Sequence, residues 1–179
     1  ALALRKAGHT IVQVYNRSNE AGEELARTVG ESFTSDLAGL ADADLYLISV
    51  KDDAISEVAS GLKLKDKFVA HTSGTKSRNL LKDVSVNYGV FYPLQTMTRK
   101  AVLDFKNIPF LLEGSNNATT MALEGVAASL SEKIHIVDEE QRQWIHVAAV
   151  FANNFTNHLY GISEHLLVEH GLPFDILKP

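Results

Sequence analysis

From residue 10 onward, short apolar runs alternate with amphipathic segments, and this alternation restricts the fold more than any other feature of the sequence. Two runs, residues 44–50 and 67–71, are almost continuously apolar, as expected for strands that are buried on both faces of a sheet. Strands that alternate with helical segments are typical of a parallel sheet covered by helices. The sequence therefore predicts an α/β fold with a doubly wound, mostly parallel, Rossmann-like sheet.

The expected strands and helices can be placed along the chain from this pattern. Strands are expected near residues 10–15, 44–50, 67–71, 88–92, 108–112 and 134–137, and helices near residues 18–29, 52–60, 75–82 and 116–130. Pro109 predicts an edge position for its strand, because proline cannot donate a hydrogen bond to a neighbouring strand. Residues 1–8 are typical of the middle and end of a helix, so we expect a first strand and a glycine-rich turn to precede Ala1.

The pattern changes after Asp138 to one helical run that continues to about His170 and stops at Gly171. A helix of roughly 30 residues is too long for a crossover between strands. We therefore expect a Rossmann-like dinucleotide-binding domain at residues 1–137 and the beginning of an all-α domain at residues 138–179. The remainder of the helical domain is expected to follow Pro179.

The long helix has two faces when its residues are placed 100° apart around the axis. The apolar face is predicted to be core and comprises Trp144, Ala148, Phe151, Phe155, Leu159, Ile162 and Leu166. The opposite face carries His146, Val150, Asn153, Asn157, Tyr160 and Glu164, with Asn154 at its margin. Such a face is either the solvated side of the helix or, because histidine and asparagine are poor helix formers and good hydrogen bonders, part of a cofactor cleft.

Composition excludes several functions. The net charge is -5 and lysine and arginine are not clustered, so the sequence predicts no basic surface for nucleic-acid binding. The absence of cysteine excludes disulfides, thiolate metal sites and cysteine nucleophiles, and the histidines lack metal-ligand spacing, so no metal site is predicted. No apolar stretch approaches the roughly 20 residues that cross a membrane. We expect a cytoplasmic protein whose partners include neither nucleic acid nor membrane.

A cation follows the first predicted strand, where dinucleotide-binding folds normally carry an acidic residue for the adenosine ribose. That strand ends in Asn16-Arg17-Ser18. A carboxylate there accepts from the ribose 2′-OH and repels a 2′-phosphate, whereas a guanidinium beside a hydroxyl can bind that phosphate. The sequence therefore predicts NADP rather than NAD as the cofactor. Two simpler roles remain open: Arg17 as a surface residue and Ser18 as a helix N-cap.

Two further strand ends are expected to line the cofactor, because ligands of open parallel sheets lie beyond the carboxyl ends of the strands. Val50, Lys51 and Asp52 follow one strand, although the carboxylates of Asp52 and Asp53 could equally act as N-caps. The next strand ends in His71, Thr72, Ser73 and Gly74, a polar cluster that either contacts the substrate or forms a hydrogen-bonded turn with a helix cap.

Hydride transfer requires a group that protonates or deprotonates the reacting atom. The candidates for this catalytic role are His71, His146 and Tyr92, with Ser73 and Asn154 as residues that orient the substrate. A single histidine on a helix is more often structural, so a structural role for His146 stays open.

Several segments together resemble one family, and they span nearly the whole chain. These segments are residues 2–9, 14–18, 48–55, 71–74, 92–96 and 146–155. They resemble the NADP oxidoreductases that join a Rossmann-like domain to a carboxy-terminal helical domain of unknown function, relatives of pyrroline-5-carboxylate reductase and the 3-hydroxyisobutyrate dehydrogenases. The resemblance implies an NADP-dependent oxidoreductase that acts on a small-molecule C=O, C=N or alcohol substrate and forms a homodimer through the helical domain.

The sequence departs from this resemblance at two positions. Val150 stands where the dehydrogenase relatives carry a catalytic lysine, and Tyr92 stands where many members of the closer family have histidine. The missing lysine keeps a second function open, a dinucleotide-binding sensor or scaffold without turnover. A flavin- or deazaflavin-linked reductase is a third alternative. The substrate itself is not predicted.

Overall fold

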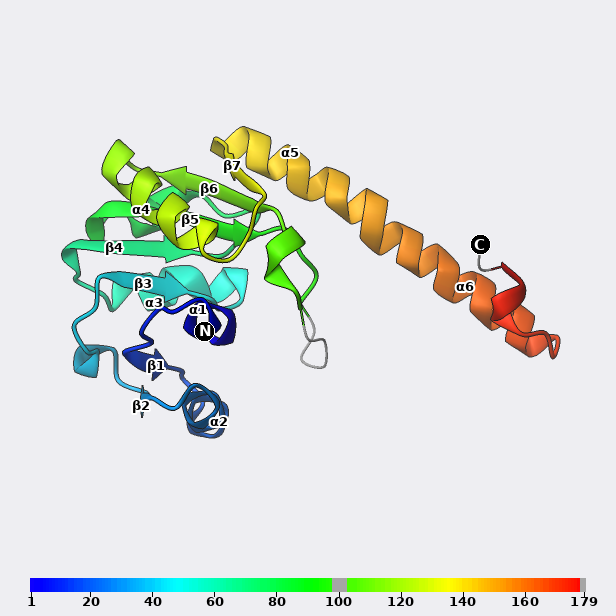
Figure 1. Cartoon of the computed structure of the whole chain (residues 1–179), viewed down its shortest axis with the longest axis horizontal. Helices are drawn as coiled ribbons and strands as arrows, with labels where there is room; N and C mark the ends of the chain where they lie inside the picture. The colour runs from blue at the N-terminus through cyan, green and yellow to red at the C-terminus, as the bar shows by residue number, and fades with distance from the viewer. Residues whose placement is uncertain (98–102, 178–179) are drawn as a thin grey trace. The chain divides into compact units, whose positions relative to one another are not determined.

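The computed structural model describes residues 1–97 and 103–177 of the chain (Figure 1). These residues divide into two compact units, Ala1–Glu139 and Glu140–Pro179. The first unit contains the sheets and the helices that cover them, and the second is helical. We describe each unit by itself.

A five-stranded sheet forms the centre of the first unit. Its strands lie in the order β3 (Leu45–Ile48), β4 (Lys65–His71), β5 (Ser85–Pro93), β6 (Phe110–Gly114) and β7 (Ile134–Ile136). Neighbouring strands are parallel except for the antiparallel pair β5 and β6. The prediction of a mostly parallel sheet is therefore confirmed.

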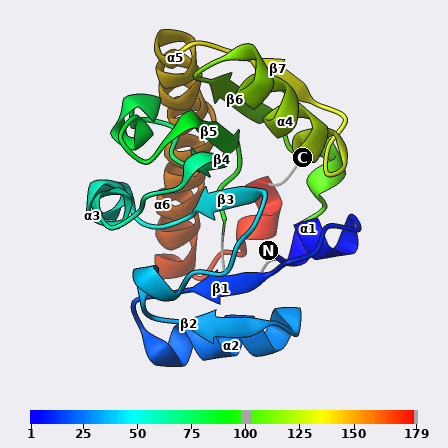
Figure 2. The same ribbon diagram turned by 90° about the vertical axis from the view of Figure 1, so that its left-hand side faces the viewer.

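Helices cover both faces of this sheet, as expected for a doubly wound fold (Figure 2). On one face, Ile48 and Val69 pack with Ile55 and Ala59 of α3 (Ile55–Ser60). On the other face, α4 (Asn117–Ala128) packs against the sheet. That second core contains Ala70, Phe91, Phe110, Leu112, Leu123 and Ala127. In β3 and β4, successive apolar residues thus belong to the cores on opposite faces of the sheet, which explains the continuous apolar runs.

A separate two-stranded parallel sheet contains β1 (Gln13–Tyr15) and β2 (Ser32–Thr34). Figure 2 shows β1 and β3 running in the same direction. The helix α2 (Asn19–Val29) packs closely on this pair, because a Cβ at Gly22 would overlap the ring of Phe33. A short helix, α1 (Leu2–Lys6), precedes β1. Strand β2 was not among the predicted strands.

Two predictions about the first unit are wrong in detail. The helix expected at residues 75–82 is a 3₁₀ turn, η3 (Arg78–Leu81), capped by the side chain of Ser77. The strand near Pro109 is not an edge strand, because β6 pairs with β5 on one side and β7 on the other. Pro109 lies just before β6 and contributes its carbonyl oxygen, which accepts from the backbone N–H of Leu94 at 2.8 Å. Its missing N–H therefore falls at the end of the β5–β6 ladder, where only the bond from Leu94 to Pro109 forms.

Within residues 1–97 and 103–177, four further 3₁₀ turns connect or end the elements. They are η1 (Leu37–Gly39), η2 (Asp52–Ala54), η4 (Phe105–Asn107) and η6 (Phe174–Leu177). Of these, η2 leads directly from the end of β3 into α3, so the residues that follow β3 are held close to the sheet.

The helical run expected from Asp138 to about His170 is confirmed, but it contains a π-helical segment. It consists of α5 (Glu139–Ala149), the π-helix η5 (Val150–Phe155) and α6 (Thr156–Glu169). A π-helix bonds residue i to i+5 and therefore has wider turns than an α-helix. Residues after Phe155 are consequently rotated around the axis relative to a 100° placement, and the predicted stripes are not continuous across this segment.

The stripe that was predicted to be core is exposed in the described chain. Trp144 is 67% exposed, Phe151 61% and Leu159 63%. The rings of Phe151 and Phe155 stack on each other at a centroid distance of 5.0 Å. The prediction of a buried core face is therefore wrong for the second unit taken by itself.

Candidate functional site

The predicted site residues of the first unit follow the carboxyl ends of three strands. Asn16 follows β1, Ser49 follows β3 and Thr72 follows β4. In an open α/β sheet this edge is where ligands bind.

The turn after β1 contains a side-chain hydrogen bond, and the side chains of Arg17 and Ser18 are exposed. The side-chain oxygen of Asn16 accepts from the backbone N–H of Ser18 at 2.9 Å, which fixes the turn. Ser18 is the N-cap of α2, as one alternative expected, but its hydroxyl makes no capping hydrogen bond. The Arg17 side chain is 79% exposed, and its Nη1 lies 3.5 Å from Oε2 of Glu57. Arg17 and Ser18 thus present a cation and a hydroxyl beside a helix N-terminus.

This donor set fits a phosphate group. The first backbone N–H groups of a helix have no partner within the helix, and the helix dipole favours negative charge there. The guanidinium adds charge-assisted donors, and the Ser18 hydroxyl adds another donor. The turn therefore has the chemistry that the 2′-phosphate of NADP requires, with one competing anion, the carboxylate of Glu57, already beside Arg17.

A hydroxyl network joins the loop after β3 to the loop after β4. Oδ2 of Asp52 accepts from the hydroxyl of Ser73 and from that of Thr75, each at 2.8 Å. The Ser73 hydroxyl oxygen also accepts from the backbone N–H groups of Thr75 and Lys76, at 3.2 and 3.1 Å. The N-cap of η2 is Lys51, so the alternative that the Asp52 carboxylate caps this turn is wrong. Asp52 instead fixes the two loops relative to each other.

Replacing Asp52 with alanine is expected to lower the free energy of unfolding by about 1.5 to 3 kcal/mol, because two hydroxyls lose a charged acceptor. Asp52→Asn keeps an acceptor oxygen and should lose less. Urea denaturation measures both, with Asp53→Ala as a control, since the Asp53 side chain is 99% exposed and pairs only loosely with Lys76 at 3.4 Å. An unchanged midpoint for Asp52→Ala would contradict this role.

His71 is fully buried, and two hydrogen bonds define its tautomer. Its Nδ1 accepts from the backbone N–H of Ser73 at 3.2 Å, and its Nε2 lies 3.2 Å from the carbonyl oxygen of Ser77. A backbone N–H only donates and a carbonyl only accepts. Nδ1 is therefore the unprotonated acceptor, and Nε2 carries the proton. In this state the imidazole holds the turn from His71 to Ser77. Proton transfer to a substrate would require it to give up one of these bonds.

The other residues of the two loops lie close to the sheet edge. Thr72 donates its backbone N–H to the carbonyl of Ile48 at 3.2 Å, and its hydroxyl lies 3.4 Å from that of Ser49. The side chains of Val50 and Lys51 are exposed, Val50 to 39%. They are accessible to a ligand that lies along this edge.

Tyr92 lies on the same face of the sheet as His71. His71 pairs with Val90 of β5, and Tyr92 follows two residues later, near the carboxyl end of that strand. Side chains two residues apart on a strand point to one face. The half-buried phenol of Tyr92 is therefore placed at the edge where β4 ends.

The remaining predicted catalytic residues belong to the helical unit. His146 is half-buried in α5, and Asn154 is exposed in the π-helical segment. The structure thus gathers the candidates of the first unit at one sheet edge, while His146 and Asn154 lie on the other unit.

Two residues of this edge, Glu57 and Thr75, were not predicted from the sequence. Thr75 follows Ser73 in a run of hydroxyl residues, Thr72 to Ser77, which could have suggested a shared acceptor. No sequence pattern pointed to Glu57, since it lies in α3 and contacts Arg17 in the turn after β1, which is distant in the sequence.

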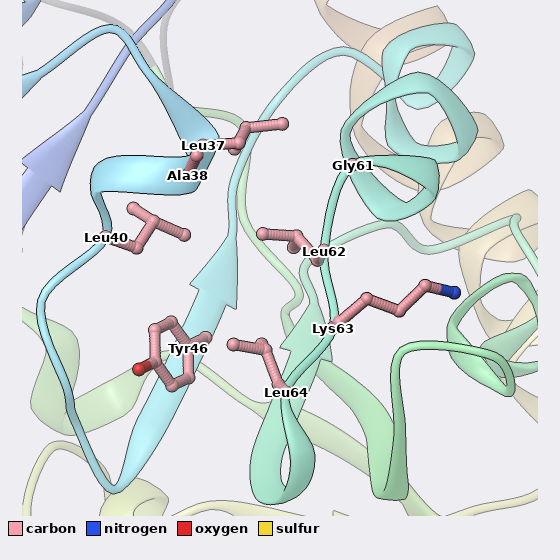
Figure 3. A pocket seen from close by; sticks show the side chains of 8 residues that line it. All are labelled: Leu37, Ala38, Leu40, Tyr46, Gly61, Leu62, Lys63 and Leu64. Atoms are coloured by element: carbon pink, nitrogen blue, oxygen red, sulfur yellow. The ribbon is translucent and has the colours of Figure 1, made fainter.

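A pocket of about 270 Å³ lies at the opposite end of the sheet (Figure 3). It is lined by residues of η1, β3 and the segment between α3 and β4: Leu37, Ala38, Leu40, Tyr46, Gly61, Leu62, Lys63 and Leu64. The Tyr46 hydroxyl is bonded to the backbone of Ala41 and Ala43, and Figure 3 shows the Lys63 amine pointing away from the hollow. The side chains that line this pocket are mainly apolar, and none of the predicted site residues is among them.

Neither a metal cluster nor a membrane-spanning helix occurs in the part of the chain that the structure describes. Residues 1–97 and 103–177 hold no group of three histidine, aspartate or glutamate side chains suited to a metal ion. Over the same residues, no helix is both long and apolar enough to cross a bilayer.

Two family matches cover most of the chain. Residues 1–73 match the family described as "NADP oxidoreductase coenzyme F420-dependent". Residues 108–179 match a domain of unknown function, DUF2520. No protein of curated function matches the sequence.

Solved structures extend these matches. The "putative NADP oxidoreductase BF3122" from Bacteroides fragilis is 39% identical, with a TM-score of 0.85 over 98% of this chain and 69% of its own. A reductive aminase from Aspergillus terreus, solved with NADPH4, cyclohexanone and allyl amine, is 17% identical, with a TM-score of 0.72 over 97% of this chain and 64% of its own.

A third structure, 1-pyrroline-5-carboxylate reductase from Streptococcus pyogenes, is 14% identical, with a TM-score of 0.68 over 98% of this chain and 68% of its own. The latter two structures share the fold. The Bacteroides structure shows the family, and NADP as the family's cofactor agrees with the prediction from Arg17. The chain belongs to the NADP oxidoreductase family in which a Rossmann-like domain is joined to a DUF2520 domain.

Proposed function

We propose that the protein transfers a hydride between NADP(H) and a small C=O, C=N or alcohol substrate. The observation that carries this proposal is the donor set of Arg17 and Ser18 at the end of β1, beside the N-terminus of α2. NADPH supplies the hydride when it is bound. We assign its binding to residues 1–137 and substrate binding to residues 138–179.

Each predicted residue then has a role that suits its surroundings. Arg17 and Ser18 bind the 2′-phosphate, with Asn16 holding their turn. The loops at Val50 to Asp52 and at Thr72 to Ser73 line the cofactor, and the Asp52 carboxylate keeps these loops together.

Proton transfer falls to Tyr92 or His146, with Asn154 orienting the substrate. His71 is less suited, because both of its ring nitrogens hold the turn after β4. A phenol or an imidazole can each donate a proton to a reacting oxygen or nitrogen. Ser73 acts on the substrate through the shape of this turn, since its hydroxyl is bonded within it.

The exposed apolar side chains of α5, η5 and α6 support a homodimer formed through the helical domain. Trp144, Phe151 and Leu159 are each more than half exposed. Large apolar side chains that are exposed along one helical element are typical of a protein interface. The absence of cysteine agrees with a reducing compartment, and we place the protein in the cytoplasm.

The first test compares NADPH with NADH on the purified protein. We expect NADPH to raise the melting temperature at concentrations where NADH has little effect, because a ligand stabilises the state that binds it. A panel of small aldehydes, ketones, imines and alcohols, followed by NADPH absorbance, then tests turnover.

Equal responses to the two nucleotides would overturn the NADP assignment. Binding without consumption of NADPH across the panel would favour the second candidate, a dinucleotide-binding sensor or scaffold. The feature that favours this candidate is Val150, at the position where the dehydrogenase relatives carry lysine.

A further inference from the structure

The guanidinium of Arg17 faces a carboxylate of its own chain. Nη1 of Arg17 lies 3.5 Å from Oε2 of Glu57, and the two side chains are 79% and 68% exposed. Arg17 belongs to the turn between β1 and α2, whereas Glu57 lies in the first turn of α3. The pair therefore spans two elements at the sheet edge where the adenosine ribose of the cofactor would lie.

We propose that Glu57 is a specificity-determining residue, an internal anion that competes with the 2′-phosphate of NADP for Arg17. The inference rests on the proposed function, because it assigns the 2′-phosphate to Arg17. Glu57 does not touch the reacting atoms and acts on cofactor choice alone.

The charges decide the direction of the effect. A phosphate monoester carries between one and two negative charges near neutral pH, so it attracts the guanidinium more strongly than one carboxylate does. Glu57 remains attached to α3 when the phosphate arrives, at a separation well within the screening length of about 8 Å. Binding of NADP therefore brings two anions to the same guanidinium, where they repel each other.

NADH does not disturb the ion pair between Arg17 and Glu57. Its ribose carries a neutral 2′-OH, which can donate to the Glu57 carboxylate and leaves Arg17 paired. The Glu57 carboxylate thus weakens NADP binding without weakening NAD binding. It therefore reduces the preference for NADP over NAD that Arg17 creates. Because both side chains are exposed, they can separate without unfolding of either element.

The test is Glu57→Gln, which removes the charge and keeps the size of the side chain. We expect NADPH to bind about 2- to 5-fold more tightly, the range that corresponds to loss of an exposed ion pair, and NADH to bind within about 1.5-fold of the parent. Isothermal titration calorimetry measures these affinities. The same titration with adenosine 2′,5′-bisphosphate and with 5′-AMP, which both lack the nicotinamide, isolates the contribution of the 2′-phosphate. The gain should shrink as salt is raised.

Glu24→Gln provides a matched control, because Glu24 is an exposed acid on α2 beyond its first turn. Unchanged NADPH affinity in Glu57→Gln, or an equal gain in Glu24→Gln, would overturn the role of Glu57. Either result leaves the proposed function standing as long as the parent prefers NADPH. If the parent binds NADPH and NADH equally, the assignment of the 2′-phosphate to Arg17 fails instead.

Discussion

Replacing Gly89 with alanine is expected to lower the free energy of unfolding by about 3 kcal/mol, at the upper end of the cost of overpacking a core. Gly89 lies in β5, beside β6 in the same sheet and against α4, which packs on that sheet. A Cβ at this position would overlap the carbonyl oxygen of Glu113 in β6 and lie 2.9 Å from Cδ1 of Leu123 in α4. The first contact is backbone in a hydrogen-bonded pair of strands, and Leu123 is fully buried. Urea denaturation followed by circular dichroism measures the loss.

Gly125→Ala is the matched control, because it is the same substitution in an open place. Gly125 lies in the interior of α4, and a Cβ there meets nothing within 4 Å. Alanine is favoured over glycine inside a helix, so this variant should gain about 0.5 to 1 kcal/mol. If the two variants changed stability in the same direction, the close packing of β5 between β6 and α4 would be incorrect.

The main sheet could be predicted because its strands are buried on both faces. Residues 44–50 and 67–71 could be predicted as strands without knowledge of their neighbours in the sheet. A short, continuous apolar run between polar segments is typical of a strand buried on both sides. Strand β2 gave no such signal, because Ser32, Phe33 and Thr34 form only three residues without a buried side chain. Short strands at the margin of a sheet depend on their neighbours rather than on their own sequence.

Tertiary contacts also explain the errors in the helices. The segment after β4 looked helical, but the side chains of His71, Ser73 and Ser77 bond to its backbone and leave room for only a 3₁₀ turn. Side chains of this kind compete with helical hydrogen bonding. The π-helix at Val150–Phe155 was hidden for a different reason, since periodicity at 100° assumes a constant number of residues per turn.

The candidate site could be predicted at the level of loops. The rule that ligands bind beyond the carboxyl ends of parallel strands selected the segments after β1, β3 and β4. It could not show that Asp52 accepts from Ser73 and Thr75, or that Glu57 faces Arg17. These contacts join separate crossovers, so they follow from the packing of helices on the sheet and not from any local spacing.

Arg17→Gln is expected to weaken NADPH binding about 10- to 100-fold and to leave NADH binding nearly unchanged. A hydrogen bond to a charged group contributes about 1.5 to 3 kcal/mol, which corresponds to this range at 25 °C. Glutamine keeps part of the length of the side chain but loses the positive charge and the paired donors of the guanidinium. Fluorescence titration with both nucleotides measures the ratio of the two dissociation constants, which should approach one in the variant.

Arg27→Gln controls for the change in net charge, because Arg27 lies in the last turn of α2, at the opposite end from the N-cap Ser18. Its effect on NADPH binding should stay within about 2-fold, as expected for an exposed charge beyond the first turn of the helix. Arg17→Asp should go further and favour NADH, since a carboxylate at the end of β1 repels the 2′-phosphate and accepts from a 2′-OH. If NADPH bound equally well to the parent, Arg17→Gln and Arg17→Asp, the phosphate would have to lie elsewhere on the sheet edge, and Glu57 would have no anion to compete with.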